Sequence, residues 1–228
     1  MISVQLLQAP AVEPVSLVEM KAHLRVEVVE DDDLIGALSA AAREHVEELT
    51  GRRLITQKWR LYLDRFTKED LYFLTFGPLM WRTSIDRASN HIKDEDVRWL
   101  QLPYAPVATV DKLTTVDANG ASSDFDLTSN AVVDVARAPA RIVLNDTADW
   151  PIPTAGLAAA NGIRVDFTVG YGADGSSVPK ALTLAIKLLT AHFYENREES
   201  TPLKLETLPV GVRALIMPHR VYARGLYR

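Results

Sequence analysis

Hydrophobic and polar positions follow a helical period near the start of the chain. Ser16 and Glu19 match a capping box, in which the hydroxyl caps a helix and the carboxylate bonds back to the cap. After an acidic run at 30–33, hydrophobic residues recur at intervals of three and four until Gly51, a residue typical of a left-handed helix stop. The pattern predicts a pair of helices within about 16–51.

A period of two then replaces the helical period, as expected for half-buried strands. Asn119-Gly120 lies between two such runs and is typical of a tight hairpin. We expect strands at 55–63 and 71–76, from 107 to the hairpin and after it, at 131–136 and 141–144, and at 163–169. Together they predict a mostly antiparallel β region over about 54–170.

Residues 79–101 do not continue this alternation. They are largely polar and charged but contain Trp81 and Trp99. We interpret the segment as an excursion from the sheet.

A second helical pattern follows the β region. Pro179 suits the first turn of a helix, and a hydrophobic stripe continues from it, so we expect a long helix over about 178–197. Helices that are segregated from runs of strands indicate an α+β fold. We predict a body over 1–201, in which the N-terminal helix pair and this helix form a helical bundle with the β region inserted between them. An extended tail follows over 202–228.

Composition limits the class of protein. The 228 residues are 47% hydrophobic and include no Cys, which excludes disulfide and thiolate chemistry. The N-terminus has no signal-peptide pattern, and no window approaches the roughly 18 apolar residues that cross a bilayer. We therefore expect a globular protein without a membrane partner.

The predicted tail and body differ in net charge. Residues 202–228 carry five Lys or Arg and one Glu, whereas the remainder carries 20 basic and 29 acidic residues. The arginines of the tail stand singly among apolar residues, which suits a groove on another protein. Two alternatives remain open, namely an arm that binds nucleic acid and a tail that folds back onto its own domain.

Two motifs suggest ligand chemistry. Gly170, Gly172 and Gly175 match a dinucleotide fingerprint, but no βαβ unit surrounds them and further residues separate them from the helix. The acidic run Glu30–Asp33 could hold a hard cation, yet acids at a helix start also stabilise the helix dipole. We predict no catalytic, cofactor-binding or metal site, with a nucleotide- or metal-dependent enzyme at these motifs as the alternative.

Nine short segments, spread over nearly the whole chain, form a recognisable combination. They are Pro14–Val26, Asp31–Ile35, Ala40–Arg52, Gln57–Trp59, Leu102–Val107, Thr168–Gly172, Val178–Leu182, Ala191–Glu198 and Leu208–Val221. Together they resemble the head–tail connector (adaptor) proteins of tailed phages, which also occur in gene transfer agents. The chain departs from this pattern in the long 79–101 stretch and in His219, where an aromatic residue is expected.

The resemblance implies a structural virion protein rather than an enzyme, without a cofactor. Such proteins form a homo-oligomeric ring, expected to be a dodecamer, under the portal protein. A neck stopper or tail protein docks on the far side, so the ring takes part in head completion and genome ejection. DNA passes through the conduit without sequence-specific binding. The expected location is the virion neck, after assembly in the bacterial host cytoplasm, and a tail stopper or terminator ring is a further alternative.

The resemblance also implies that the C-terminal segment reaches the portal. Apolar residues and arginines are the types that anchor protein interfaces. The expected portal-interface residues are Leu203, Leu205, Leu208, Val212, Arg213, Leu215, Ile216, Arg220, Val221, Tyr222 and Arg224.

Overall fold

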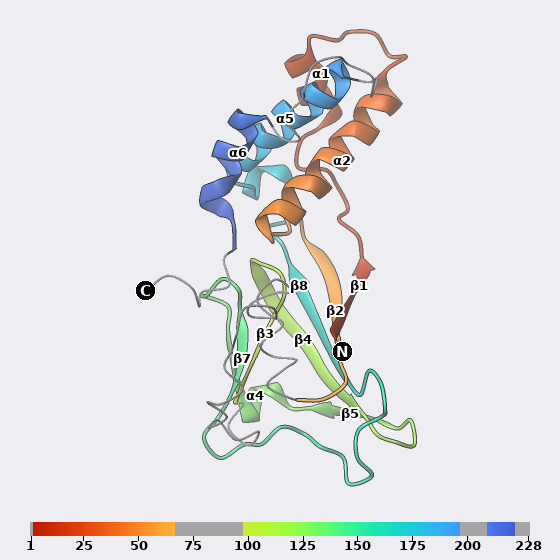
Figure 1. Ribbon diagram of the computed structural model, residues 1–228, viewed down its shortest axis with the longest axis vertical. Helices are drawn as coiled ribbons and strands as arrows, with labels where there is room; N and C mark the ends of the chain where they lie inside the picture. The colour runs from red at the N-terminus through yellow and green to blue at the C-terminus, as the bar shows by residue number, and fades with distance from the viewer. Residues whose placement is uncertain (1, 67–97, 197–208, 222–228) are drawn as a thin grey trace, which may run out of the picture. The chain divides into compact units, whose positions relative to one another are not determined.

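The computed structural model describes residues 2–66, 98–196 and 209–221 (Figure 1). The chain forms two compact units. A helical unit is built from Pro10–Thr56 and Gly170–Val221, and a β unit contains Met1–Ala9 and Gln57–Val169. The predicted α+β class is confirmed. The division differs from the predicted body and tail, because the described part of the predicted tail, 209–221, groups with the helical unit.

The helical unit contains the three helices that the sequence predicts, Leu17–Leu24 (α1), Asp32–Thr50 (α2) and Lys180–Glu195 (α5). It also contains a helix at Val210–Ile216 (α6), where an extended tail was predicted. The capping box is confirmed, since the Ser16 side chain accepts from the Glu19 backbone N–H and the Glu19 carboxylate accepts from the Ser16 backbone. Gly51 ends α2 in the left-handed conformation, at φ 68°.

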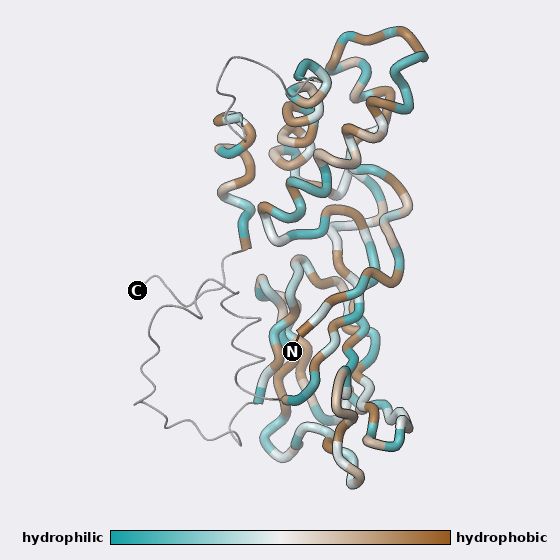
Figure 2. Tube along the Cα trace, turned by 45° about the vertical axis from the view of Figure 1, so that its right-hand side comes forward, coloured by the Kyte–Doolittle hydropathy of each residue, from teal (hydrophilic) through white to brown (hydrophobic). Residues whose placement is uncertain are grey.

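One hydrophobic core holds the helical unit together. α5 packs against both α2 and α6, and α1 contacts α2 and α5 (Figure 1). Hydrophobic and hydrophilic positions are interleaved along these helices (Figure 2), which leaves each with one apolar side to bury. The fully buried side chains include Met20, Ile35, Val46, Ile186 and Val212. Burial of each such side chain contributes about 1.5–3 kcal/mol.

The β unit contains a five-stranded antiparallel sheet with the order β1-β2-β8-β4-β5. The strands are Ile2–Gln8 (β1), Gln57–Leu63 (β2), Val107–Val116 (β4), Ser122–Phe125 (β5) and Ile163–Val169 (β8). β8 is central and buries every second residue, as its sequence predicts. The hairpin at Asn119-Gly120 is confirmed, with Gly120 at φ 86°.

A three-stranded sheet with the order β3-β7-β6 completes the β unit. Its strands are Trp99–Gln101 (β3), Ala131–Asp134 (β6) and Arg141–Leu144 (β7), and the short helix α4 spans Leu127–Asn130. The core of the unit joins residues of both sheets, among them Leu61, Phe167 and Ile142.

The sequence did not predict every element of the β unit correctly. β1 and α4 were not predicted, and Trp99 belongs to a strand rather than to an excursion. The predicted strand 71–76 and residues 79–97 of the predicted excursion lie outside the described residues. The β unit also includes the N-terminal strand, so it is more than an insertion between helices.

Candidate functional site

Residues 209–221, within the predicted docking segment, form ordered structure on the helical unit. α6 is followed by a 3-10 turn, η4 (Met217–His219). Val212 and Ile216 are buried in the core of this unit, and Leu215 packs against its edge. This corresponds to the alternative in which the tail folds back onto its own domain, and Val212 and Ile216 are consequently not available to a partner in this conformation.

Polar contacts fasten this segment to the end of α2. The Val221 N–H donates to the Thr50 carbonyl at 2.7 Å, and the Arg52 guanidinium donates to the His219 carbonyl. Burial of the His219 ring, and secondarily the nearby charge of Arg52, lower the pKa of this imidazole. The contacts hold the chain after α6 against the Gly51 turn.

An exposed surface remains on the outer side of α6 and η4. Of the predicted interface residues, Arg213 and Arg220 are exposed and Val221 is half-buried. The exposed apolar residues beside them, Val210 and Met217, were not predicted, although a helical wheel of 210–217 would have separated them from Val212 and Ile216. The remaining predicted residues lie outside the described ranges: Leu203, Leu205, Leu208, Tyr222 and Arg224.

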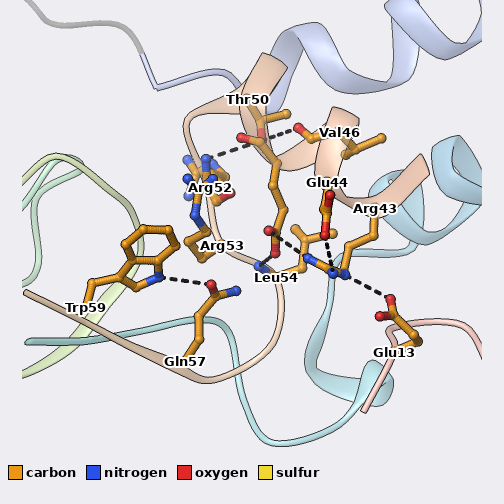
Figure 3. Close-up of polar contacts among 11 residues, drawn as sticks. Glu13, Arg43, Glu44, Val46, Thr50, Arg52, Arg53, Leu54, Gln57 and Trp59 are labelled. Carbon is orange, nitrogen blue, oxygen red and sulfur yellow. Dashed lines mark hydrogen bonds and ion pairs between the residues drawn. The ribbon is translucent and has the colours of Figure 1, made fainter. Parts of the chain in front are cut away.

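An ionic network around the buried Arg43 and Glu47 organises the turn after α2 (Figure 3). The Arg43 guanidinium donates to Glu13 at 2.8 Å and to Glu47 at 3.1 Å, and it also contacts Glu44 at 3.3 Å. The second oxygen of Glu47 accepts from the Leu54 N–H at 2.8 Å. The network therefore ties the segment before α1, the helix α2 and the chain that leaves α2 to one another.

The environment of these two charges shifts their protonation. Burial raises the pKa of Glu47, and this outweighs the hydrogen bond from Leu54 and the charge of Arg43. Burial alone would lower the pKa of Arg43, but the carboxylates of Glu47 and Glu13 outweigh it and raise the pKa. Each group in the pair depends on the other, because a lone buried charge is costly.

The glycine motif serves close backbone packing. Gly170 has φ 126°, and a Cβ atom there would lie 2.6 Å from the backbone of Ile55. A Cβ at Gly175 would lie 2.1 Å from the Pro14 carbonyl oxygen. α5 begins only at Lys180, so its N-terminus does not open within the glycines as a dinucleotide site requires.

The acidic run is engaged by neighbouring helices. Asp32 forms an ion pair with Lys21 of α1, and the Tyr194 hydroxyl of α5 donates to Asp31. Across the described ranges, no group of three or more His, Cys, Asp or Glu side chains is arranged to hold a metal ion. In the same ranges, no helix is long and apolar enough to cross a membrane.

Charged residues on one face of the five-stranded sheet pair across strands. Arg60 of β2 binds Asp166 of β8 through two hydrogen bonds, at 2.5 and 2.7 Å, which raise the pKa of the arginine. Lys112 and Asp124 pair at 3.1 Å. Such neutralised cations are poorly suited to gripping phosphates, because phosphate binding requires Lys or Arg that can replace counterions.

These features define an α+β protein with a helical unit and an antiparallel β unit. Residues 14–70 match the family model described as phage gp6-like head–tail connector protein. Among curated proteins, no sequence matches this chain significantly.

Solved structures with the same fold come from particles of gene transfer agents. One chain of the neck of an empty particle, computed with C6 symmetry, is 27% identical with a TM-score of 0.68, over 96% of this chain and 95% of that chain. A chain of the native virion is 25% identical with the same TM-score and coverage. A chain of the native neck, computed with C12 symmetry, is 28% identical with a TM-score of 0.64, over 95% of both chains. The resemblance to head–tail connectors is confirmed.

Proposed function

We propose that this chain is a structural head–tail connector of a virion neck. The observation that carries this proposal is the similarity to neck proteins of gene transfer agents over 96% of the chain. The connector family model, which matches residues 14–70, supports the same role. The virion neck is accordingly the proposed location, reached after assembly in the cytoplasm of a bacterial host.

The chain acts as one subunit of a ring. The related neck structures have C6 or C12 symmetry, which supports a closed ring, and a dodecamer is the state that matches the C12 neck. A ring of this kind repeats one heterologous interface, so every copy needs two different complementary surfaces. The helical-bundle arrangement of the helices would contribute to its wall.

The ring would surround DNA without gripping it. The chain carries 25 basic and 30 acidic residues, and several of the basic ones described above are held by carboxylates. Tight phosphate binding depends on several Lys or Arg contacts. An acidic protein with paired cations is suited to a conduit through which DNA slides, and no sequence-specific contact is needed.

One end of the ring would bind the portal through the C-terminal segment, and the other would accept a stopper or tail protein. Because Val212 and Ile216 are occupied in the core, the contact surface of the described residues is the outer side of α6 and η4. Arg213 and the exposed Val210 and Met217 combine a charge with apolar area there. Arg and Met are both enriched at protein interfaces.

Reversing one exposed charge tests the portal contact. Arg213→Glu should weaken capture of the portal protein by about tenfold, equivalent to about 1.4 kcal/mol, with no change in the melting temperature. Lys180→Glu is the matched control, because Lys180 is also exposed on the helical unit and undergoes the same charge change. Equal portal binding by both variants and the parent chain would show that α6 does not contact the portal.

We infer a non-enzymatic role. At the glycine motif, other backbone segments pack closely against Gly170 and Gly175. In the acidic run, Asp32 pairs with Lys21 and Asp31 accepts from Tyr194. Neither the nucleotide- or metal-dependent enzyme nor the stopper or terminator ring is favoured by a specific observation, whereas the connector family model favours the adaptor.

A further inference from the structure

β1 has the properties of an unprotected sheet edge. One side pairs with β2, and among the residues that the structure describes no strand pairs with its other side. Its seven residues, Ile2–Gln8, include no charged residue and no proline. Soluble proteins usually protect such edges with charges, prolines or covering segments, because unpaired backbone groups invite another strand.

The apolar face of β1 also extends beyond the core. Val4 lies opposite Leu61, and Leu6 lies opposite Trp59, so both point to the core side of the sheet. Leu61 is fully buried, yet Val4 is 36% and Leu6 is 42% exposed. The sheet therefore presents core-type residues that its own core leaves uncovered.

A second uncovered apolar surface lies on the three-stranded sheet. Trp99, Val143 and Val132 are opposite one another across β3, β7 and β6, and they form one row on its outer face. Val132 is 58% exposed. Val132 and Val143 of this row also line a shallow hollow of about 450 Å³ on β6 and β7, together with Val135 and Ala136. Arg141 and Asp134, which form an ion pair, line it as well.

We propose that β1 of one copy docks on β6 and this hollow in the next copy. The inference rests on the proposed ring, because a ring needs two different complementary surfaces on every subunit. Val4 and Leu6 would cover Val132 and Val143, and the edge of β1 would pair with the edge of β6, on which no strand of the described residues lies. Strand addition of this kind gains backbone hydrogen bonds along with apolar burial.

The residues of β6 suit β1 as a partner strand better than the residues of β5 do. β5 begins with Ser122, Ser123 and Asp124, whereas β6 consists of Ala131, Val132, Val133 and Asp134, with the aspartate held by Arg141. An apolar, uncharged strand gains little against hydroxyls and a carboxylate. It gains most where the partner edge is equally apolar.

Disulfide trapping tests the contact, because the chain has no native Cys. Particles should be assembled with Leu6→Cys/Val132→Cys and oxidised mildly. A ladder of covalent multimers on a non-reducing gel is expected, since a heterologous contact links each copy to the next. Gln5→Cys/Val132→Cys is the matched control, because Gln5 lies on the opposite face of β1, where it accepts from Tyr62.

The outcomes separate the interface from the proposed function. A ladder from Leu6→Cys/Ser123→Cys in place of the Val132 pair, or no ladder from a chain present in particle necks, would overturn the β1–β6 contact and leave the connector role standing. Absence of the parent chain from the necks would instead overturn the connector role. In addition, Leu6→Lys should abolish ring assembly without lowering the melting temperature of the isolated chain, whereas Gln5→Lys should assemble.

Discussion

Individual buried residues in this chain mainly fix how its segments join. The sequence assigned no separate role to Arg43 and Glu47, which occur only within the connector-like segment Ala40–Arg52. A helical period of 3.6 residues does not reveal which charged residues turn inward. The structure shows both buried, with Glu47 also accepting from the Leu54 backbone. This contact satisfies the Leu54 N–H in the chain that leaves α2.

Removing one partner of this pair should be costlier than changing both. Arg43→Leu removes the cation that donates to the buried Glu47 carboxylate. The charge of Arg53 still acts on Glu47, so we expect a loss of up to about 3–5 kcal/mol in the free energy of unfolding. Arg43→Leu/Glu47→Gln removes the Glu47 charge and keeps an oxygen for the Leu54 N–H, so it should recover a large part of the loss. Urea unfolding of both variants measures the difference. A double variant no more stable than Arg43→Leu would contradict this account of the network.

The role of the glycine motif also could not be predicted from its residues alone. Its letters suggest phosphate binding, whereas the structure uses Gly170 and Gly175 where other backbone segments approach too closely for a Cβ atom. Close backbone approach is a property of the tertiary structure. The sequence could exclude the nucleotide reading through the missing βαβ unit, but it could not identify Ile55 and Pro14 as the neighbours.

At the scale of elements, local signals identified most helices and strands. The capping box, Gly51 and Asn119-Gly120 each determine backbone geometry within a few residues, and each prediction is confirmed. β1 was missed because its seven residues precede the helices and pair with a strand about fifty residues later. α6 was missed because Pro209, Gly211 and Pro218 indicate a broken chain, although the residues between them suffice for two turns.

α6 should behave as an integral part of the helical unit. Ile216→Ala removes a side chain that is 2% exposed, and we expect a loss of about 2–5 kcal/mol in the free energy of unfolding. Val210→Ala is the matched control on the same helix, because Val210 is 69% exposed, and its effect should stay within about 0.5 kcal/mol. Thermal or urea unfolding separates the two. Equal stability of both variants would show that α6 does not contribute to the core.

At the scale of the whole molecule, the resemblance carried more information than any single motif. Composition and charge could indicate only that the C-terminal segment contacts something, whereas motifs spread over the chain identified connectors. The comparison with solved necks supports this over nearly the full length. Neither surface in the proposed β1–β6 contact was predicted, because each depends on which strands lie at sheet edges, and sheet order is set by long-range pairing.

The connector role predicts where the protein is found. Cryo-electron microscopy of the portal vertex of intact particles that contain this chain tests it most directly. We expect density for a closed ring of copies between the portal and the next neck component, into which both units of the chain fit. Intact necks without that density, or density for the chain only at another position in the particle, would contradict the proposed function.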